Sequence, residues 1–337
     1  MKNFIVLIFL FLSTILLNAQ ENIDDLLAAG VEDAKRFSTD YLAPATEGTM
    51  YSINNGWFNS AKSPHRFGVE ISLIGNLSFI QDEKKSFIMN VADYENIRFP
   101  DNETSKSVAT ALGHNDPDVV VIVTYEDPVF GDQEVALTLP TGIGSENINL
   151  IPSAFLQASF SPFKGTQVKG RFFPNIKAED IEIGMYGFGL QQDFTSWLPA
   201  DKVIPVSISG LIAYTHLNGK YSFEETSVVQ GENQRTNTEI NTILAQLIVS
   251  TNLKIVNFYG ALGYLSGKST TDLLGTYIVT DGVLFSEEIV DPFSVKQKVS
   301  GMRVSLGANL KLGFFGLNLD YTIAEFNSAS LGINFSI

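Results

Sequence analysis

The stretch that decides the fold is "SASLGINFSI", residues 328–337. Its apolar side chains alternate with small or polar ones, in the order Ala329, Leu331, Ile333, Phe335 and Ile337. A period of two predicts a β-strand with one apolar and one polar face. A strand in this position must have a partner on both sides or leave an unpaired edge. We expect it to pair with both the preceding strand and the first one, which closes a barrel.

The same alternation recurs along most of the chain. Eleven further segments are predicted to be strands, at residues 67–79, 119–123, 133–139, 154–160, 168–172, 181–190, 206–216, 244–250, 256–264, 302–310 and 317–323. Segment 119–123 fits the pattern least well, because "VVVIV" is apolar on both faces. Many segments approach the length of about ten residues with which a tilted strand crosses a bilayer. The sequence therefore predicts an all-β fold, a transmembrane antiparallel β-barrel of about twelve strands (10–14) over residues 66–337.

The polar face of these strands carries charges. An Arg or Lys that faces lipid near the bilayer midplane costs about 2–4 kcal/mol. A barrel of about twelve strands also has a lumen too wide for wall side chains alone to fill. We therefore expect the apolar face to meet lipid and the polar face to line a hydrated lumen. The predicted lumen-lining residues are Glu70, Lys169, Arg171, Arg303, Lys311 and Asp320.

The predicted connections fall into two classes. Short ones lie at residues 161–165, 251–254 and 313–316, and longer polar ones near 81–117, 217–240 and 266–298. Outer-membrane barrels place short turns in the periplasm and long loops outside the cell. In "TYIVTDGVLF" the dipeptide Asp281-Gly282 predicts a hairpin within the last long loop.

Residues 1–19 resemble a cleaved signal peptide. Lys2 precedes an apolar run, and small residues close the segment at Leu17-Asn18-Ala19. The alternative is a membrane anchor, but the run is shorter than the roughly 20 apolar residues of a spanning helix. The sequence has no cysteine, which excludes disulfides, thiol catalysis and lipid attachment at a cysteine.

Residues 20–65 differ from the barrel region. Their apolar side chains follow a helical stripe formed by Ile23, Leu27, Val31, Ala34 and Tyr41. We expect this helix to end at Pro44, and a turn-rich segment, "NNGWFNSAK", to follow at residues 54–62. This part is either a periplasmic tail or a plug inside the lumen. The plug is favoured because large aromatic side chains are costly to leave in water, and the plug residues would be Tyr51, Trp57 and Phe58. The charges that face the lumen either select solutes, as rings of charge in porins do, or keep the lumen wet or hold the plug, and both interpretations stay open.

Charge and motifs exclude several classes of function. The net charge is −15, which makes nucleic acid a poor partner. "GYLSGKST" has three residues between its glycines where a phosphate loop has four, so we interpret it as a strand-end turn. His65, His114 and His216 are far apart, and a solvated loop is a simpler interpretation of Asp116 and Asp118 than a Ca²⁺ site. We expect no enzyme, no metal and no cofactor, although a Ser–His–Asp site assembled by the fold stays open.

A helix, an Asn/Gly-rich segment and a barrel together resemble the FadL-type outer-membrane transporters of hydrophobic compounds. The chain is more similar to an uncharacterised outer-membrane barrel family, through "RFFP" (171–174), "GLQQDFTSWLP" (189–199) and "IPVSISGLIAYT" (204–215). FadL-type barrels usually have fourteen strands, and no ligand residue of that family matches a position here. The last strand also resembles the signal read by the barrel-assembly machinery, with Phe335 third from the end.

The resemblance implies a protein of the Gram-negative outer membrane, exported through its signal peptide. It also implies passive uptake of a small hydrophobic compound through a plugged lumen. Two alternatives stay open, a general diffusion porin for polar solutes and a non-transporting barrel that presents surface loops to a partner. The expected partners are the surrounding lipid, the assembly machinery and a small hydrophobic ligand.

Overall fold

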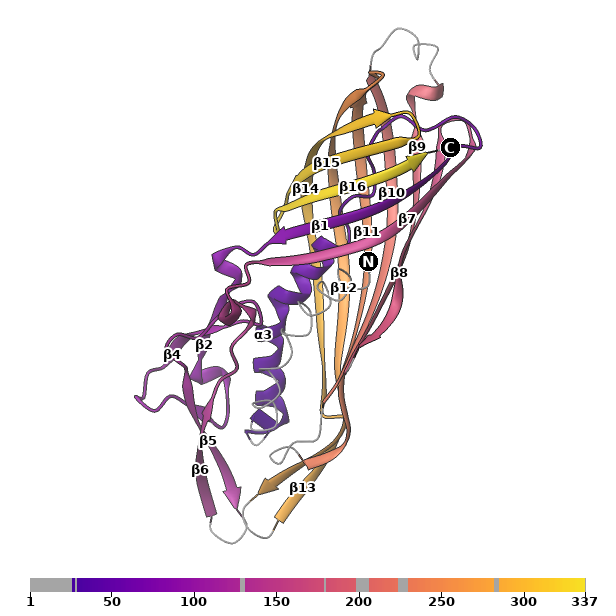
Figure 1. Cartoon of the computed structure of the whole chain (residues 1–337). Helices are drawn as coiled ribbons and strands as arrows, with labels where there is room; N and C mark the ends of the chain where they lie inside the picture. Colours follow the sequence, from indigo (N-terminus) through magenta and orange to yellow (C-terminus); the bar gives the residue numbers. More distant parts are fainter. Residues whose placement is uncertain are drawn as a thin grey trace.

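The computed structural model describes residues 26–27, 29–127, 131–178, 180–197, 206–223, 230–281 and 285–336. In this part of the chain, one sheet of antiparallel strands closes on itself through the pairing of β11 with β12 (Figure 1). The ten barrel strands are β1 (Val69–Phe79), β7 (Leu150–Phe163), β8 (Thr166–Ala178), β9 (Ile181–Asp193), β10 (Val206–Ser222), β11 (Gln230–Thr251), β12 (Val256–Asp281), β14 (Phe293–Leu312), β15 (Phe315–Ile323) and β16 (Ser328–Ser336). The predicted all-β antiparallel barrel is confirmed, with ten strands rather than about twelve.

The last strand closes the barrel as expected. Phe335 of β16 lies opposite Phe315 of β15 on one side and opposite Ile71 of β1 on the other. Every residue of this strand therefore has a neighbouring strand on each side, and the sheet has no free edge at this point.

Two predicted barrel strands belong to a different sheet, so their placement in the barrel was wrong. β5 (Val120–Asp127) and β6 (Gly131–Thr138) pair with each other, and β5 also pairs with β3 (Ile97–Arg98). Next to them β2 (Ser86–Asn90) pairs with β4 (Ser105–Ala109). Val121 and Val123 are fully buried in a core outside the barrel wall. The uniform apolar character of segment 119–123 reflects this core and not a lipid face.

The barrel strands are much longer than predicted. Residues 217–240 and 266–298 were expected to be loops, but β10, β11, β12 and β14 continue through most of them. β12 alone has 26 residues, roughly 85 Å at about 3.3 Å per residue. The prediction failed because the outward side chains of these stretches are polar, which was interpreted as a loop composition. β13 (Phe285–Val290) pairs with the end of β12, with Phe285 opposite Asp281, so the predicted hairpin is confirmed.

The helix α3 (Val31–Ser52) is also longer than predicted. It was expected to end at Pro44, but Pro44 lies inside it. A proline in a helix interior costs about 3 kcal/mol or more, mainly through a lost backbone hydrogen bond and a steric clash. The residues after Pro44 bury Met50, Tyr51 and Ser52 against the barrel interior, and we attribute the continuation of the helix to this packing.

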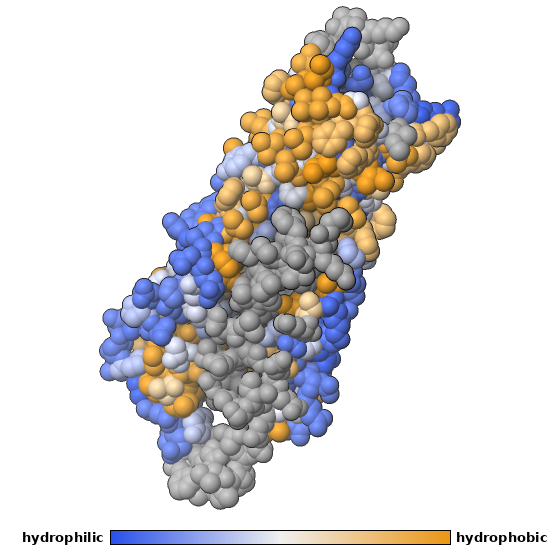
Figure 2. Space-filling model, viewed as in Figure 1, coloured by the Kyte–Doolittle hydropathy of each residue, from blue (hydrophilic) through white to orange (hydrophobic). Residues whose placement is uncertain are grey.

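An apolar band surrounds one end of the barrel. Each of the ten strands exposes a large apolar side chain there, for example Leu73, Leu156, Phe172, Phe188, Ile212, Leu247, Leu262, Leu306, Leu319 and Leu331. We call this end, with the short β7–β8, β11–β12 and β14–β15 turns, the rim end. On the face drawn in Figure 2, apolar surface covers the rim end, and the coloured residues of the opposite end are mostly hydrophilic.

A single row of residues marks where the band stops. His216, Asn241, Lys268 and Lys298 lie side by side on β10, β11, β12 and β14. We call them the boundary row and the strands beyond them the extension. In the extension α3 packs against the wall and against β2–β6, through a core that contains Phe37, Tyr41, Leu273 and Tyr277.

The remaining elements are short. They are the 3₁₀ turns η1 (Asp82–Lys84), η2 (Val91–Asp93), η3 (Ile143–Glu146) and η4 (Thr195–Trp197). The predicted signal peptide, residues 1–19, lies outside the described residues. No helix in the described part of the chain is both long and apolar enough to cross a bilayer.

Candidate functional site

Residues 53–62, here called the plug segment, run through the inside of the barrel from the end of α3 towards the start of β1 (Figure 1). The side chains of Trp57 and Phe58 are 0% and 6% exposed, and Tyr51 at the end of α3 is 2% exposed. The structure thus places all three predicted plug residues in the barrel core. That this segment gates the barrel stays a prediction.

Three buried cations of the wall hold the backbone of the plug segment. They donate hydrogen bonds to its carbonyl oxygens: Lys169 Nζ to Trp57 (2.8 Å), Arg171 Nη1 to Ile53 (2.7 Å) and Arg303 Nη1 to Asn54 (3.3 Å). A turn-rich segment has no helix or sheet partners for its carbonyls, and a buried carbonyl without a donor costs about 1–3 kcal/mol. The three cations therefore serve as backbone partners of the plug segment. Two interpretations of these charges were open, selection of solutes and contact with the plug, and their buried hydrogen bonds favour contact with the plug.

Trp57 occupies a slot in the wall. The guanidinium of Arg171 lies between two rings, 4.0 Å from the centroid of Trp57 and 3.8 Å from that of Phe155. On the β9 side, a Cβ atom added at Gly187 or Gly189 would lie 3.1 or 3.0 Å from the Trp57 ring. Glycine at these two positions leaves room for the indole, and the cation–π contact contributes attraction on its other side.

Asp320 reaches the plug segment indirectly. Tyr259 donates a hydrogen bond from its hydroxyl to Asp320 Oδ2 (3.0 Å), and Asn318 Nδ2 donates to the Tyr259 hydroxyl (3.3 Å). The ring of Phe58 packs edge-on against Tyr259, with 5.5 Å between centroids. The carboxylate thus orients the tyrosine that contacts the plug.

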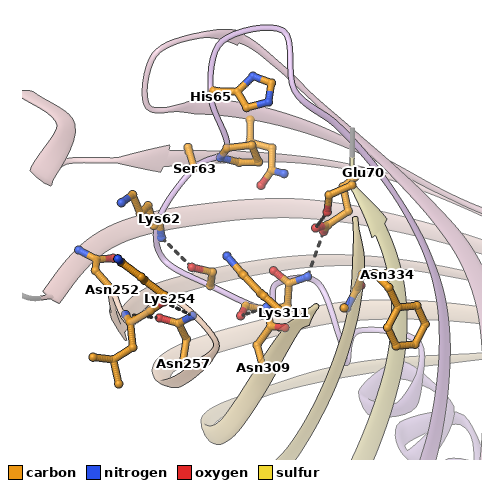
Figure 3. Close-up of a pocket in the computed structure, with 18 of the residues that line it drawn as sticks. Lys62, Ser63, His65, Glu70, Asn252, Lys254, Asn257, Asn309, Lys311 and Asn334 are labelled. Carbon is orange, nitrogen blue, oxygen red and sulfur yellow. Dashed lines mark hydrogen bonds between the residues drawn. The ribbon is translucent and has the colours of Figure 1, made fainter. Parts of the chain in front are cut away.

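Glu70 and Lys311, the other two predicted lumen residues, lie at a pocket of about 460 Å³ at the rim end, here called the rim pocket (Figure 3). Glu70 accepts hydrogen bonds from Asn59 Nδ2 (3.0 Å) and from the Ser336 hydroxyl (2.8 Å). The plug segment forms one wall of this pocket through Asn59, Ser60 and Lys62. The six predicted residues therefore divide into two groups. Lys169, Arg171, Arg303 and Asp320 lie in the part of the lumen that contacts the plug segment, here called the plug-binding interior, and Glu70 and Lys311 lie at the rim pocket.

Beside α3, three adjoining cavities of about 230, 120 and 80 Å³ form what we call the helix-side cavities. The first two share Tyr41 and Leu42, and the first and third share Ile151, Ile183 and Leu217. Their lining is mostly apolar side chains from α3, β7, β9 and β10, with threonines of α3 and β11 among them. Such a surface suits an apolar molecule better than an ion.

The wall beside the smallest cavity is not continuous. In the described stretches of β7 and β8, pairing towards the extension ends at Leu156 opposite Phe172, although β7 begins at Leu150 and β8 continues to Ala178. The two strands separate there in Figure 1. Residues 151–155 and Phe173, on the two sides of this seam, line the smallest cavity. Phe172 also lies opposite Tyr186, and Tyr186 opposite His216, so the seam begins at the level of the boundary row.

The motifs that could have carried catalysis or metal binding are dispersed. His65 lies at the rim pocket, His114 beside Thr141 and His216 in the boundary row. Within the described ranges, no group of three His, Cys, Asp or Glu could hold a metal ion. "GYLSGKST" continues as part of β12, so its interpretation as a strand-end turn was wrong.

Several residues of the plug-binding interior were missed by the sequence analysis. Gln157 accepts from Arg171, Gln191 donates to the carbonyl of Ser60 (2.8 Å), and Asn309 donates to that of Asn59 (3.1 Å). Their position on the polar face was available from the period of two. The partners of Gln191 and Asn309 were not, because each is a backbone carbonyl more than a hundred residues away.

The comparison with solved structures returns several outer-membrane proteins. One is Ail, the attachment invasion locus protein of Yersinia pestis (9% identity, 81% of this chain and 99% of that chain, TM-score 0.27). Another is the translocator domain of the autotransporter NalP from Neisseria meningitidis (10% identity, 93% and 97% covered, TM-score 0.27). Likenesses at these TM-scores carry no argument about fold or function. The resemblance to FadL-type transporters stays a prediction.

The search of curated proteins finds no match to the chain. A protein-family model does match it, over residues 1–337, and this model carries no functional assignment. The chain therefore belongs to DUF6588, a family of unknown function.

Proposed function

We propose that this protein is an outer-membrane β-barrel through which a small hydrophobic compound is taken up passively, past the plug segment. The observation that carries the proposal is the set of helix-side cavities, which adjoin the β7–β8 seam and reach the start of the plug segment at Ser52 and Ile53. An apolar compound that enters there leaves water before it meets the plug segment.

The apolar band supports placement in a membrane. Large apolar side chains on all ten strands face outward at one end, and such an exposed surface would aggregate in water unless lipid or another protein covered it. A closed barrel satisfies its backbone hydrogen bonds within the wall, which a hydrocarbon environment requires. With short turns in the periplasm, the extension faces the exterior of the cell.

The diffusion-porin alternative is less favoured. It rested on charged side chains that face the lumen, yet Lys169, Arg171 and Arg303 are nearly fully buried and bind the plug segment. A polar solute would have to replace these hydrogen bonds in order to pass. A scaffold for surface loops becomes the better interpretation if the protein binds no apolar compound.

Binding of an apolar dye tests the proposal. The full chain in detergent or lipid nanodiscs should bind N-phenyl-1-naphthylamine with increased dye fluorescence. Leu217→Trp fills two of the helix-side cavities and should weaken binding at least about tenfold. Ile212→Trp, on the outward face of the same strand, is the matched control and should change affinity less than about twofold. Equal affinity of wild type and both variants would contradict a ligand in these cavities.

A disulfide between the plug segment and the wall tests whether the plug segment gates the barrel. The Ser60 and Ser250 hydroxyl oxygens are 3.4 Å apart, and the chain has no other cysteine to interfere with a Ser60→Cys/Ser250→Cys pair. The oxidised pair should bind the dye normally but pass less of it into proteoliposomes, and reduction should restore passage. Passage that is unchanged in the oxidised protein would show that the plug segment does not gate.

A further inference from the structure

The rim pocket collects unpaired positive charge in an acidic protein. Its titratable lining consists of Lys62, His65, Glu70, Lys254 and Lys311. The whole chain has only 22 Lys and Arg and a net charge of −15, so three lysines around one pocket do not follow from a basic composition.

The three lysines come from different parts of the chain. Lys62 ends the plug segment, Lys254 lies in the β11–β12 turn, and Lys311 is near the end of β14. Figure 3 shows all three at the pocket, with Lys311 between Glu70 on one side and Lys62 and Lys254 on the other. The fold therefore brings three lysines, one of them on the plug segment, to a single cavity.

One carboxylate, that of Glu70, stands against the three lysines at the rim pocket. The ion pairs within 4 Å among the described residues involve other lysines and Arg98. Both oxygens of Glu70, the one carboxylate of the pocket, already accept hydrogen bonds from Asn59 and Ser336. Lys311 is attracted by the charge of Glu70 and repelled by that of Lys62. Like charges held together in this way favour an anion between them.

The other polar groups of the pocket also fit an oxygen-rich ligand. Side-chain amides of Asn252, Asn257, Asn334 and Gln167 line it, and amides can bind carboxylate, phosphate or sugar oxygens. The volume of about 460 Å³ lies within the range of small-molecule sites. It has room for a compound larger than a single inorganic ion.

We infer that the rim pocket is a binding site for a small organic anion with at least two carboxylate or phosphate groups. Such an anion contacts Lys62 on one side and Lys254 and Lys311 on the other. It thereby connects the end of the plug segment to the barrel wall. The binding site is independent of the proposed function, whereas the effect on uptake rests on it.

Calorimetric titration of the full chain in detergent tests the binding site. The probes are citrate, which carries three carboxylates, and fructose 1,6-bisphosphate, which carries two phosphates. Comparing their affinities shows which kind of acid group the pocket prefers. Lys254→Gln/Lys311→Gln should weaken binding of the preferred probe at least about tenfold. The matched control is Lys268→Gln/Lys298→Gln, which removes the same charge from two exposed lysines of β12 and β14 at the boundary row.

The titration distinguishes a specific anion site at the rim pocket from a general effect of positive charge. Loss of affinity in the rim variant but not in the control supports the site. Equal losses in both variants would show a general charge effect, and absence of binding to the folded wild type by both probes would overturn the inference. Neither result depends on dye uptake, so failure here leaves the proposed function intact.

A labelling experiment tests the connection to the plug segment. Ala61 is fully buried and does not line the rim pocket, so Ala61→Cys should react with a maleimide only when the plug segment moves. The preferred probe should slow this reaction several-fold in an otherwise wild-type background and have no effect together with Lys254→Gln/Lys311→Gln. An unchanged rate in the first case would leave a binding site without an effect on the plug.

Discussion

The band and the extension are built from the same strands with opposite use of their two faces. On β11, Leu247 faces outward in the band while Gln246 and Ser250 face inward. On β12, Lys268 faces outward at the start of the extension, whereas the inward side farther along carries Leu273 and Tyr277. The period of two is constant along each strand, but the chemistry of the inner and outer faces exchanges near the boundary row.

The contents of the barrel explain this exchange. In the band the interior holds the plug segment, whose carbonyls need donors such as Lys169 and Arg171. In the extension it holds α3, which satisfies its own backbone hydrogen bonds and presents apolar side chains such as Phe37. The wall therefore supplies polar donors where it meets irregular backbone, alongside apolar contacts such as Leu244 and Ile248, and is mainly apolar where it meets α3.

The largest expected effect comes from removing an apolar contact inside the extension. Phe37 is 1% exposed and stacks on Tyr41, with 5.6 Å between centroids. Phe37→Ala should lower the free energy of unfolding of the extension by about 3–5 kcal/mol, because it removes buried contacts and leaves a cavity. Hydrogen exchange of α3 amides should accelerate at least about a hundredfold, while band strands stay protected.

The control for this change is Ile88→Ala on the exposed face of β2, which should leave exchange in α3 almost unchanged. If Phe37→Ala destabilised the band strands equally, the two regions would be one cooperative unit and the comparison would lose its basis.

The next effect tests the outer surface of the band. Leu247→Arg places a charge in the apolar band, which the proposed function places in lipid, and should cost about 2–4 kcal/mol near the bilayer midplane. Glu239→Arg, on the same strand and face but in the extension, should change stability by less than about 0.5 kcal/mol. Urea unfolding in lipid vesicles measures both. If both substitutions lowered stability by about 2–4 kcal/mol, lipid would cover the whole strand. If neither did, lipid would cover none of it.

The smallest effect concerns the ion pairs between the two regions. Lys84 binds Glu47 of α3 (2.8 Å) and Glu325 beside β15 (2.7 Å). Partial burial opposes the charged form, but the hydrogen bonds to Glu325 and Glu47 outweigh it and raise the pKa of Lys84 above its ordinary value of 10.5. The contribution of Lys84 to the free energy of unfolding is therefore complete below pH 10.5. It is lost as the pH rises through the higher pKa that Lys84 has in the folded protein.

Lys84→Met should destabilise the protein by at most about 1 kcal/mol at pH 8, and this difference from wild type should shrink above pH 11. Lys85→Met is the control, because Lys85 pairs only with the exposed Asp82 in the described structure. A difference that stays constant from pH 8 to 12 would mean that packing, and not charge, accounts for the effect.

The sequence predicted the barrel and three aromatic residues inside it, Tyr51, Trp57 and Phe58, but not the length of the strands. Strict alternation identified the wall strands, and it also placed Lys169, Arg171 and Arg303 on the inner face. It could not reveal the extension, because a strand that is polar outside and packs on a helix inside has no lipid face to recognise. The helix was predicted to end at Pro44 because the sequence shows the cost of a proline in a helix interior. The sequence does not show the packing of Met50 and Tyr51, which lets the helix continue.

The passage of residues 53–62 through the interior has a consequence for the order of assembly. These residues lead into β1, and β1 completes the ring only by pairing with β16, near the other end of the chain. The plug segment, which is synthesised early, is thus enclosed only when β16, which is synthesised late, pairs with β1. A chain truncated before Ser328 should leave β1 without this neighbour and the enclosed residues without a complete wall.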